Sequence, residues 1–213
     1  EAVVYSYLPE ETGHQKTIFE AMNYSVKAGG KRLRLLLMRE VYRLFGGNGP
    51  EIGPFMAAME MIHTSSLIHD DLPCMDNDEY RRGKLTTWKA YGYDMAVLAG
   101  DALMIYAFEV ASKAFTMGAD PAKVGRAIGI LAEKTGIYGM IGGQTVDVEL
   151  TGKAVPREKL DFIYRLKTGA LLEASMMIGA VLAGASDEEI REVETMASEV
   201  GLAFQIQDDI LDV

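Results

Sequence analysis

The sequence has little cysteine, little histidine and no excess of positive charge. Cys74 is the only cysteine among 213 residues, so no disulfide bond can form within the chain, and we expect a cytoplasmic location. Lys and Arg number 21 against 31 Asp and Glu, and this net charge of −10 argues against a nucleic-acid partner. No apolar run approaches the roughly 18–20 residues of a membrane span, so we expect no stable membrane insertion.

Proline and strand patterns are also scarce. Six prolines separate long stretches that are rich in Ala, Leu, Met, Glu and Lys, which are good helix formers, and no alternating pattern indicates a strand. We predict helices at about residues 15–28, 32–46, 51–72, 90–117, 121–140, 157–183 and 187–212. The stretch "TGALLEASMMIGAVLAGA" is apolar nearly all round and predicts a central helix, while Ser186 and Glu189 have the spacing of a capping box. No linker divides residues 1–213, so the predicted fold class is all-α, a single-domain antiparallel helix bundle.

The first notable motif is an acidic cluster in "SLIHDDLPCMDNDEYRRGK", with Asp70, Asp71 and Asp76. Pro73 should end the preceding helix, and a turn there can bring Asp76 back towards Asp70. Carboxylates are disfavoured at a helix C-terminus, so three of them favour a bound cation. All-oxygen ligands suit Mg²⁺, which often bridges to substrate phosphates. The alternative is an acidic turn exposed to solvent.

A second acidic cluster stands at the end of the chain, in "FQIQDDILDV". Asp208, Asp209 and Asp212 share an arc of about 100° on a helix whose neighbouring residues are apolar. Carboxylates grouped on a partly buried face repel one another without a counter-charge. Two such clusters on separate helices predict two metal-binding walls that face each other across one cavity.

Several basic and polar residues could bind phosphate. "AGGKRLR" places Lys31 and Arg34 after a Gly pair at a helix N-terminus, and Arg81 and Arg82 offer bidentate contacts. Alone, the Gly-Lys-Arg segment is better explained as a solvated basic turn, and Arg81 with Arg82 is also compatible with ordinary surface charge. Further along the chain, Lys167 and Thr168 interrupt an apolar segment, and Gln144 follows a Gly pair. A snorkelling lysine and a buried polar contact are the simpler interpretations of Lys167 and Gln144.

In order along the chain, "GGKRLR", "HDDLPCMDNDEYRRGK", "GGQ", "LKTGALLEAS" and "FQIQDDILD" resemble the motifs of the trans-prenyl diphosphate synthases, the polyprenyl synthetase family. The resemblance implies a helical bundle around a deep central cavity, a homodimer, and three Mg²⁺ ions per active site. It implies the condensation of isopentenyl diphosphate with an allylic diphosphate. The family continues for several more helices, so we expect residues 1–213 to be one polyprenyl synthetase domain that lacks its C-terminal helices.

The resemblance also implies roles for individual residues. The Mg²⁺ ligands would be Asp70, Asp71, Asp76, Asp208, Asp209 and Asp212. Isopentenyl diphosphate would be bound by Lys31, Arg34, His63 and Arg82. The allylic substrate would contact Arg81, Lys167, Thr168 and Gln205, and Gln144 would also bind substrate. The residues expected to be catalytic are Asp70, Lys167 and Asp208.

The resemblance also implies which residues control the length of the prenyl product. In the family, bulky residues four or five places before the first motif aspartate block the cavity. Here these positions are Ser66 and Ser65, and two small residues favour a product in the C15–C20 range, C20 ahead of C15. Helix packing is the alternative role for both serines.

A metal-dependent phosphohydrolase would exploit His69 beside Asp70, but it usually needs more histidines than the three present. A terpene cyclase and a non-catalytic partner subunit of the same fold are two further rival functions.

Overall fold

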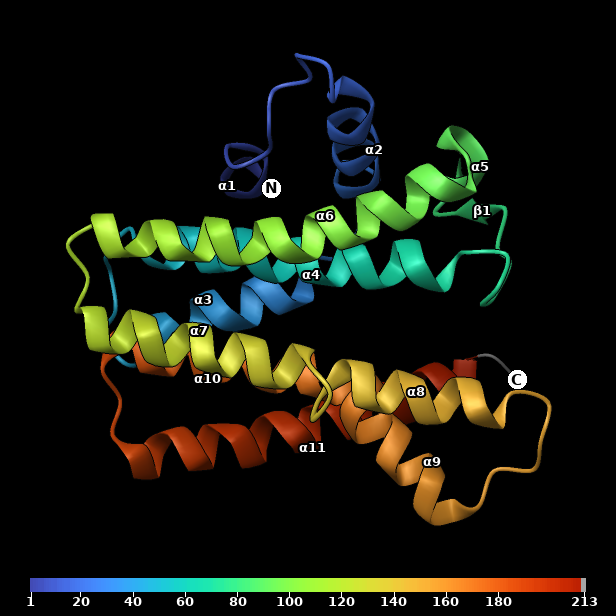
Figure 1. Cartoon of the computed structure of the whole chain (residues 1–213). Helices are drawn as coiled ribbons and strands as arrows, with labels where there is room; N and C mark the ends of the chain where they lie inside the picture. Colours follow the sequence, from blue (N-terminus) through green and yellow to red (C-terminus); the bar gives the residue numbers. More distant parts are fainter. Residues whose placement is uncertain (212–213) are drawn as a thin grey trace. The chain divides into compact units, whose positions relative to one another are not determined.

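The computed structural model describes residues 1–211, apart from the side chains of Asp208, Asp209 and Leu211. It divides into two compact units (Figure 1), Glu1–Leu33 with Gly53–Ala114, and Arg34–Ile52 with Phe115–Val213. Helices dominate both units, which confirms the all-α prediction. Among the described residues, the only strands are β1 (Tyr80–Arg81) and β2 (Lys84–Leu85), which pair antiparallel. That residues 1–213 form one domain stays a prediction.

The first unit is built on two long helices that run in opposite directions (Figure 1). Its helices are α1 (Ala2–Tyr5), α2 (Lys16–Val26), α4 (Ile52–Asp70), α5 (Thr87–Tyr91) and α6 (Tyr93–Ser112). Helix α2 packs against α5 and α6. Helix α4 is apolar and mostly buried, with Phe55, Met59 and Ile62 fully enclosed. This burial fixes the orientation of α4, and therefore of the acidic turn that follows it.

The second unit is a group of helices around α10. Its elements are α3 (Leu33–Leu44), α7 (Pro121–Thr135), α8 (Met140–Leu150), α9 (Arg157–Ile163), η2 (Tyr164–Gly169), α10 (Ala170–Ala183) and α11 (Asp187–Leu211), and a short turn, η1 (Lys113–Thr116), links α6 towards α7. Every residue from Ala170 to Leu182 is buried, and α10 packs against α7 and α11, which confirms the predicted central helix. The predicted capping box is also present, because Ser186 N–H donates to Glu189 at 2.7 Å and Glu189 N–H donates to Ser186 Oγ at 3.3 Å.

The structure differs from the predicted elements in several places, among them α1, which was not predicted, and a break at Gly92 between α5 and α6 inside the predicted helix 90–117. Helix α8 (Met140–Leu150) lies in the interval between the predicted helices 121–140 and 157–183, where no helix was predicted. Gly136, Gly139, Gly142 and Gly143 weaken the helical signal there, and α8 is stabilised by its packing on η2. Within the predicted helix 157–183, η2 is a π-helical turn. The two-residue strands are too short to give a detectable alternation.

Two helices among the described residues are long and apolar enough to span a membrane, Tyr93–Thr116 and Arg157–Ala183. The sequence expectation was that no apolar run is long enough to span a membrane. These two helices still meet the criterion of length and mean hydropathy, because that criterion allows one or two charged residues. Of the qualifying windows in these two helices, 39% and 78% respectively are buried inside the protein. A buried core helix meets the same criterion, so the absence of membrane insertion stays a prediction.

Candidate active site

The first acidic motif forms the predicted turn at the end of α4. The helix ends at Asp70, and the chain then reverses so that Asp76 N–H donates to the Asp70 carbonyl at 2.9 Å. Asn77 N–H donates to the Leu72 carbonyl at 3.1 Å, and Asn77 adopts a left-handed φ of 57°. The turn therefore brings Asp76 back to Asp70, as the position of Pro73 predicted.

Asp71 has a different surrounding from the other two aspartates. It is 3% exposed, and Arg81 binds it with three hydrogen bonds of 2.6–3.0 Å. Burial raises the pKa of the Asp71 carboxyl, and the nearby Arg81 only partly offsets this. The role of Asp71 as a Mg²⁺ ligand stays a prediction; in this structure its partner is Arg81. The pair joins the end of α4 to the β-hairpin.

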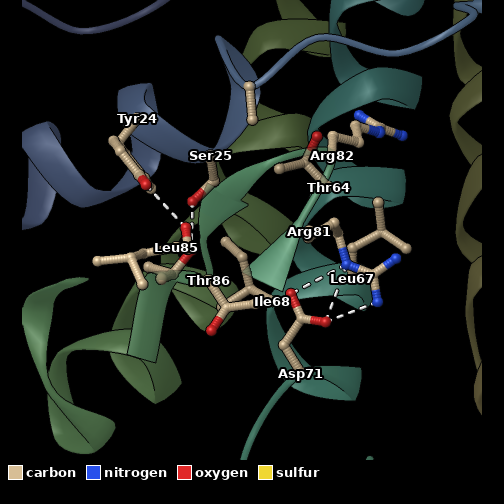
Figure 2. A pocket seen from close by; sticks show the side chains of 12 residues that line it. Tyr24, Ser25, Thr64, Leu67, Ile68, Asp71, Arg81, Arg82, Leu85 and Thr86 are labelled. Carbon is tan, nitrogen blue, oxygen red and sulfur yellow. Dashed lines mark hydrogen bonds and ion pairs between the residues drawn. The ribbon is translucent and has the colours of Figure 1, made fainter. Parts of the chain in front are cut away.

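The hairpin is also anchored on α2, beside a small pocket (Figure 2). Tyr24 Oη donates to the Leu85 carbonyl at 2.7 Å, and the hydroxyls of Ser25 and Thr87 lie 2.6 Å apart. The pocket has a volume of about 30 Å³, enough for one or two water molecules and too small for a diphosphate. Arg81 and Arg82 both line it, and Arg81 is held there by Asp71.

Arg82 and the Gly-rich loop before α3 form a basic cluster. Arg82 Nη1 donates to the Gly29 carbonyl, and a Cβ at Gly30 would lie only 2.7 Å from the same nitrogen. Lys31 follows directly in this loop and is exposed. Burial lowers the pKa of Arg82, and the positive charges of Arg32 and Arg81 lower it further. Cations held this close together attract an anion, as expected of a phosphate-binding site.

A buried ion pair that was not predicted supports this cluster. Arg32 Nη1 donates to Glu60 of α4, and Arg32 Nη2 donates to the Val26 carbonyl at 2.8 Å. Glu60 is 2% exposed, and Arg32 has a left-handed φ of 52°. The pair attaches the Gly-rich loop to α4 three residues before His63. The signal was present in the sequence, because Glu60 is the one acid in the apolar run "FMAAMEMIHTSSLI".

Other α4 residues with predicted roles lie along the same helix. His63 and Ser66 are partly exposed, whereas Ser65 is fully buried. Each serine hydroxyl donates to the carbonyl three residues earlier, Ser65 at 2.8 Å and Ser66 at 2.9 Å. These bonds fit the packing role, and a role in product length stays a prediction. His69 Nε2 lies 3.3 Å from the Val97 carbonyl of α6, which gives this histidine a structural partner away from the acidic turn.

In the second unit, three residues with predicted substrate roles come together around η2. Lys167 and Thr168 belong to η2, and Thr168 Oγ1 donates to Gln205 of α11 at 3.0 Å. Lys167 Nζ donates to Asp147 of α8 at 2.6 Å. Residues that are 37 and 20 positions apart in sequence therefore meet in space. Sequence reasoning missed Asp147, although it stands four residues after the glycine of "GQTVD".

The remaining residues with predicted roles are Gln144, Arg34 and the aspartates of the second acidic motif. Gln144 lies on α8, and Arg34 lies on α3 and belongs to the second unit, whereas Lys31, His63 and Arg82 belong to the first. The predictions for the carboxylates of Asp208 and Asp209, and for all of Asp212, lie outside the described residues. That the two acidic motifs face each other concerns both units and stays a prediction.

The donor chemistry of the first acidic turn fits Mg²⁺. Within the described part of the chain, no three His, Cys, Asp or Glu side chains are close enough to hold a metal ion. Asp70 is partly exposed and Asp76 is exposed, and the backbone hydrogen bond between them keeps both near the surface of the turn. Mg²⁺ usually takes one or two carboxylates and completes its shell with water and substrate phosphates. The turn suits an ion shared with a substrate better than one enclosed by protein alone.

The chain belongs to the polyprenyl synthetase family, which it matches over residues 15–213. It is 51% identical over 200 residues to the heterodimeric geranylgeranyl pyrophosphate synthase large subunit 1, chloroplastic, of Arabidopsis thaliana, covering 92% of this chain and 54% of that protein. It is 45% identical over 214 residues to the farnesyl diphosphate synthase of Geobacillus stearothermophilus, covering 100% and 71%. The crystal structure of an FPP/GFPP synthase from Zymomonas mobilis superposes with a TM-score of 0.93 at 38% identity, covering 99% and 76%.

The family assignment confirms the resemblance seen in the motifs, and the structural match confirms an all-α fold like that of these synthases. The chain spans about half the length of the plant relatives it matches, 54% of the Arabidopsis thaliana protein and 53% of a geranylgeranyl pyrophosphate synthase of Capsicum annuum.

Proposed function

We propose that the full-length protein is a Mg²⁺-dependent prenyltransferase that condenses isopentenyl diphosphate with an allylic diphosphate. The product would be an all-trans prenyl diphosphate of C15–C20. The observation that carries this proposal is the basic cluster of the first unit, in which Arg82 binds the loop that presents Lys31, next to the acidic turn of Asp70 and Asp76. A diphosphate needs cations of this kind, and the acidic turn supplies oxygen ligands for Mg²⁺.

The reaction breaks the C1–O bond of the allylic substrate and transfers the allylic carbon to the double bond of isopentenyl diphosphate. Mg²⁺ would supply electrostatic stabilisation of the departing diphosphate. Arg81 and Lys167 would bind the same group through charge-assisted hydrogen bonds. Lys31, Arg82 and His63 would hold isopentenyl diphosphate, whose C4 attacks C1, and the released diphosphate would take the proton lost from C2. Apolar surroundings would keep water from the allylic cation.

The rival functions lack comparable support. A phosphohydrolase would use His69 with Asp70, but His69 contacts the α6 backbone at Val97 and packs against Gly100. The intact acidic turn of Asp70 and Asp76 speaks against a non-catalytic subunit. A terpene cyclase has no need of the isopentenyl-binding cluster around Lys31 and Arg82.

Substrate selectivity in variants tests the proposal. Full-length protein with Mg²⁺ is incubated with labelled isopentenyl diphosphate and dimethylallyl, geranyl or farnesyl diphosphate, and products are separated by chromatography. Lys31→Ala should raise KM for isopentenyl diphosphate about tenfold or more and leave KM for the allylic substrate nearly unchanged, because only one substrate loses a charged contact. Equal increases in both KM values, or no prenyl product from the wild type, would overturn the proposal.

A homodimer and a cytoplasmic location are further parts of the proposal. Helix α6 supports the dimer, since Leu98 and Ile105 are 54% and 72% exposed on a long apolar helix. The single exposed Cys74 fits a reducing compartment. Analytical ultracentrifugation of the full-length protein and fluorescence microscopy of a tagged copy would test the two statements.

A further inference from the structure

The segment that carries Lys167 is an unusual piece of backbone. η2 (Tyr164–Gly169) is a π-helical turn between α9 and α10, which continue it on either side without a break. Such turns are rare and occur frequently at functional sites. A π turn rotates its side chains relative to those of a regular helix, so the direction of Lys167 depends on the neighbours that hold η2.

Two glycines allow neighbouring helices to approach η2 very closely. A Cβ at Gly143 of α8 would lie 2.3 Å from the Lys167 backbone nitrogen, which leaves no room for any side chain. A Cβ at Gly201 of α11 would lie 3.1 Å from Gly169 Cα. Backbone atoms cannot move aside as the end of a flexible side chain can. The main chain around Lys167 is therefore fixed between α8 and α11.

Asp147 adds a contact to the side chain of the same lysine. It stands four residues after Gly143, so both lie on one face of α8. Asp147 Oδ2 accepts a hydrogen bond from Lys167 Nζ at 2.6 Å. One face of α8 thus contacts the backbone of Lys167 through Gly143 and its ammonium group through Asp147.

Stability does not explain this ion pair well. The side chains of Lys167 and Asp147 are 30% and 40% exposed, and pairs in contact with solvent contribute little to folding. Orientation explains it better. An ammonium group has three N–H donors, so one hydrogen bond to Asp147 leaves two for the oxygens of a diphosphate. A long lysine side chain held at one point loses fewer conformations when the substrate binds.

We propose that Asp147 is a positioning residue that directs Lys167 towards the diphosphate of the allylic substrate. This inference rests on the proposed function, in which Lys167 contacts that diphosphate. Asp147 itself touches no substrate, so all of its effect on turnover passes through Lys167.

A double-mutant cycle tests this dependence. Full-length wild type, Asp147→Ala, Lys167→Ala and the double variant are compared for kcat and for KM of each substrate, with melting temperature as a check of folding. Glu149→Gln is the matched control, because Glu149 is an exposed carboxylate two residues further along α8 whose side chain can be neutralised without affecting η2. Asp147→Asn is included because an amide oxygen still accepts a hydrogen bond.

Asp147→Ala should lower kcat about 10–100-fold, the effect expected of a misplaced catalytic group, with KM for isopentenyl diphosphate unchanged. Asp147→Asn should recover part of the loss. In the Lys167→Ala background, Asp147→Ala should have no further effect, because no ammonium group remains to be positioned. Glu149→Gln should match the wild type.

Additive losses in the double variant, or an Asp147→Ala variant as active as Glu149→Gln, would overturn the inference while the proposed function stands. Full activity of Lys167→Ala would instead refute the substrate role of Lys167, and the inference would fail with it. Loss of activity in Asp147→Ala together with a lower melting temperature than the control would show a structural role and would also overturn the inference.

Discussion

Replacing Arg32 should show how much the buried pair of Arg32 with Glu60 contributes to stability. Arg32→Ala leaves a carboxylate that is 2% exposed without its hydrogen-bonded counter-charge. Breaking a buried pair from one side costs about 3–5 kcal/mol. The charge of Arg82 also acts on Glu60, so we expect the lower end, about 3 kcal/mol. At about 2–4 °C per kcal/mol, the melting temperature should fall by about 6–12 °C.

Circular dichroism during heating measures this loss, and Arg126→Ala is the matched control. Arg126 donates to Asp187 at 2.6 Å, but the two side chains are 45% and 71% exposed, so removing Arg126 should cost about 0–1 kcal/mol. A double variant, Arg32→Met with Glu60→Leu, should recover most of the lost stability, since no unpaired charge remains buried. If Arg32→Ala melts at the same temperature as Arg126→Ala, the assigned importance of the buried pair is refuted.

Three further predictions concern stability and product. Tyr42 donates to Glu51 at 2.6 Å, and burial together with this bond raises the pKa of Tyr42 to about 12 from its usual 10.0. A raised pKa adds stability that is complete below pH 10 and is lost as the pH rises towards 12. The difference in free energy of unfolding between wild type and Tyr42→Phe, measured by urea denaturation, should therefore shrink over that range. A difference that stays constant would contradict this. Gly179→Ala should destabilise the protein by about 1–3 kcal/mol, because its Cβ would lie 2.4 Å from the Met38 carbonyl oxygen. The control, Gly125→Ala, has open space around it and should stabilise α7 by about 0.5–1 kcal/mol. Equal melting temperatures of the two variants would disprove the close contact at Gly179. Ser65→Tyr should shorten the prenyl product seen by chromatography, and an unchanged product would remove Ser65 from the control of chain length.

Local patterns predicted the features that depend on neighbouring residues. Pro73 predicted the end of α4 and the return of Asp76 to Asp70, and Ser186 predicted the start of α11. Both follow from backbone hydrogen bonding over a few residues. The all-round apolar character of α10 likewise predicted its burial.

Features that depend on distant residues were not predictable in this way. The partners Arg32 and Glu60 are 28 residues apart, and Asp147 and Lys167 are 20 apart, so each contact depends on the final packing. Helix α8 was missed because its glycines lower helix propensity, yet Gly143 is what permits the close contact with η2. The sequence contained these residues, but only the packing shows which of them meet.

The most direct test of the proposed reaction is the release of diphosphate by the full-length protein with both substrates, with each alone, and after EDTA. The account predicts release only with both substrates and Mg²⁺, with one diphosphate released for each isopentenyl unit incorporated into the product, because every new carbon–carbon bond costs one allylic diphosphate. Release from one substrate alone without a prenyl product would indicate hydrolysis, and no release with both would indicate a non-catalytic subunit; either result would contradict the account.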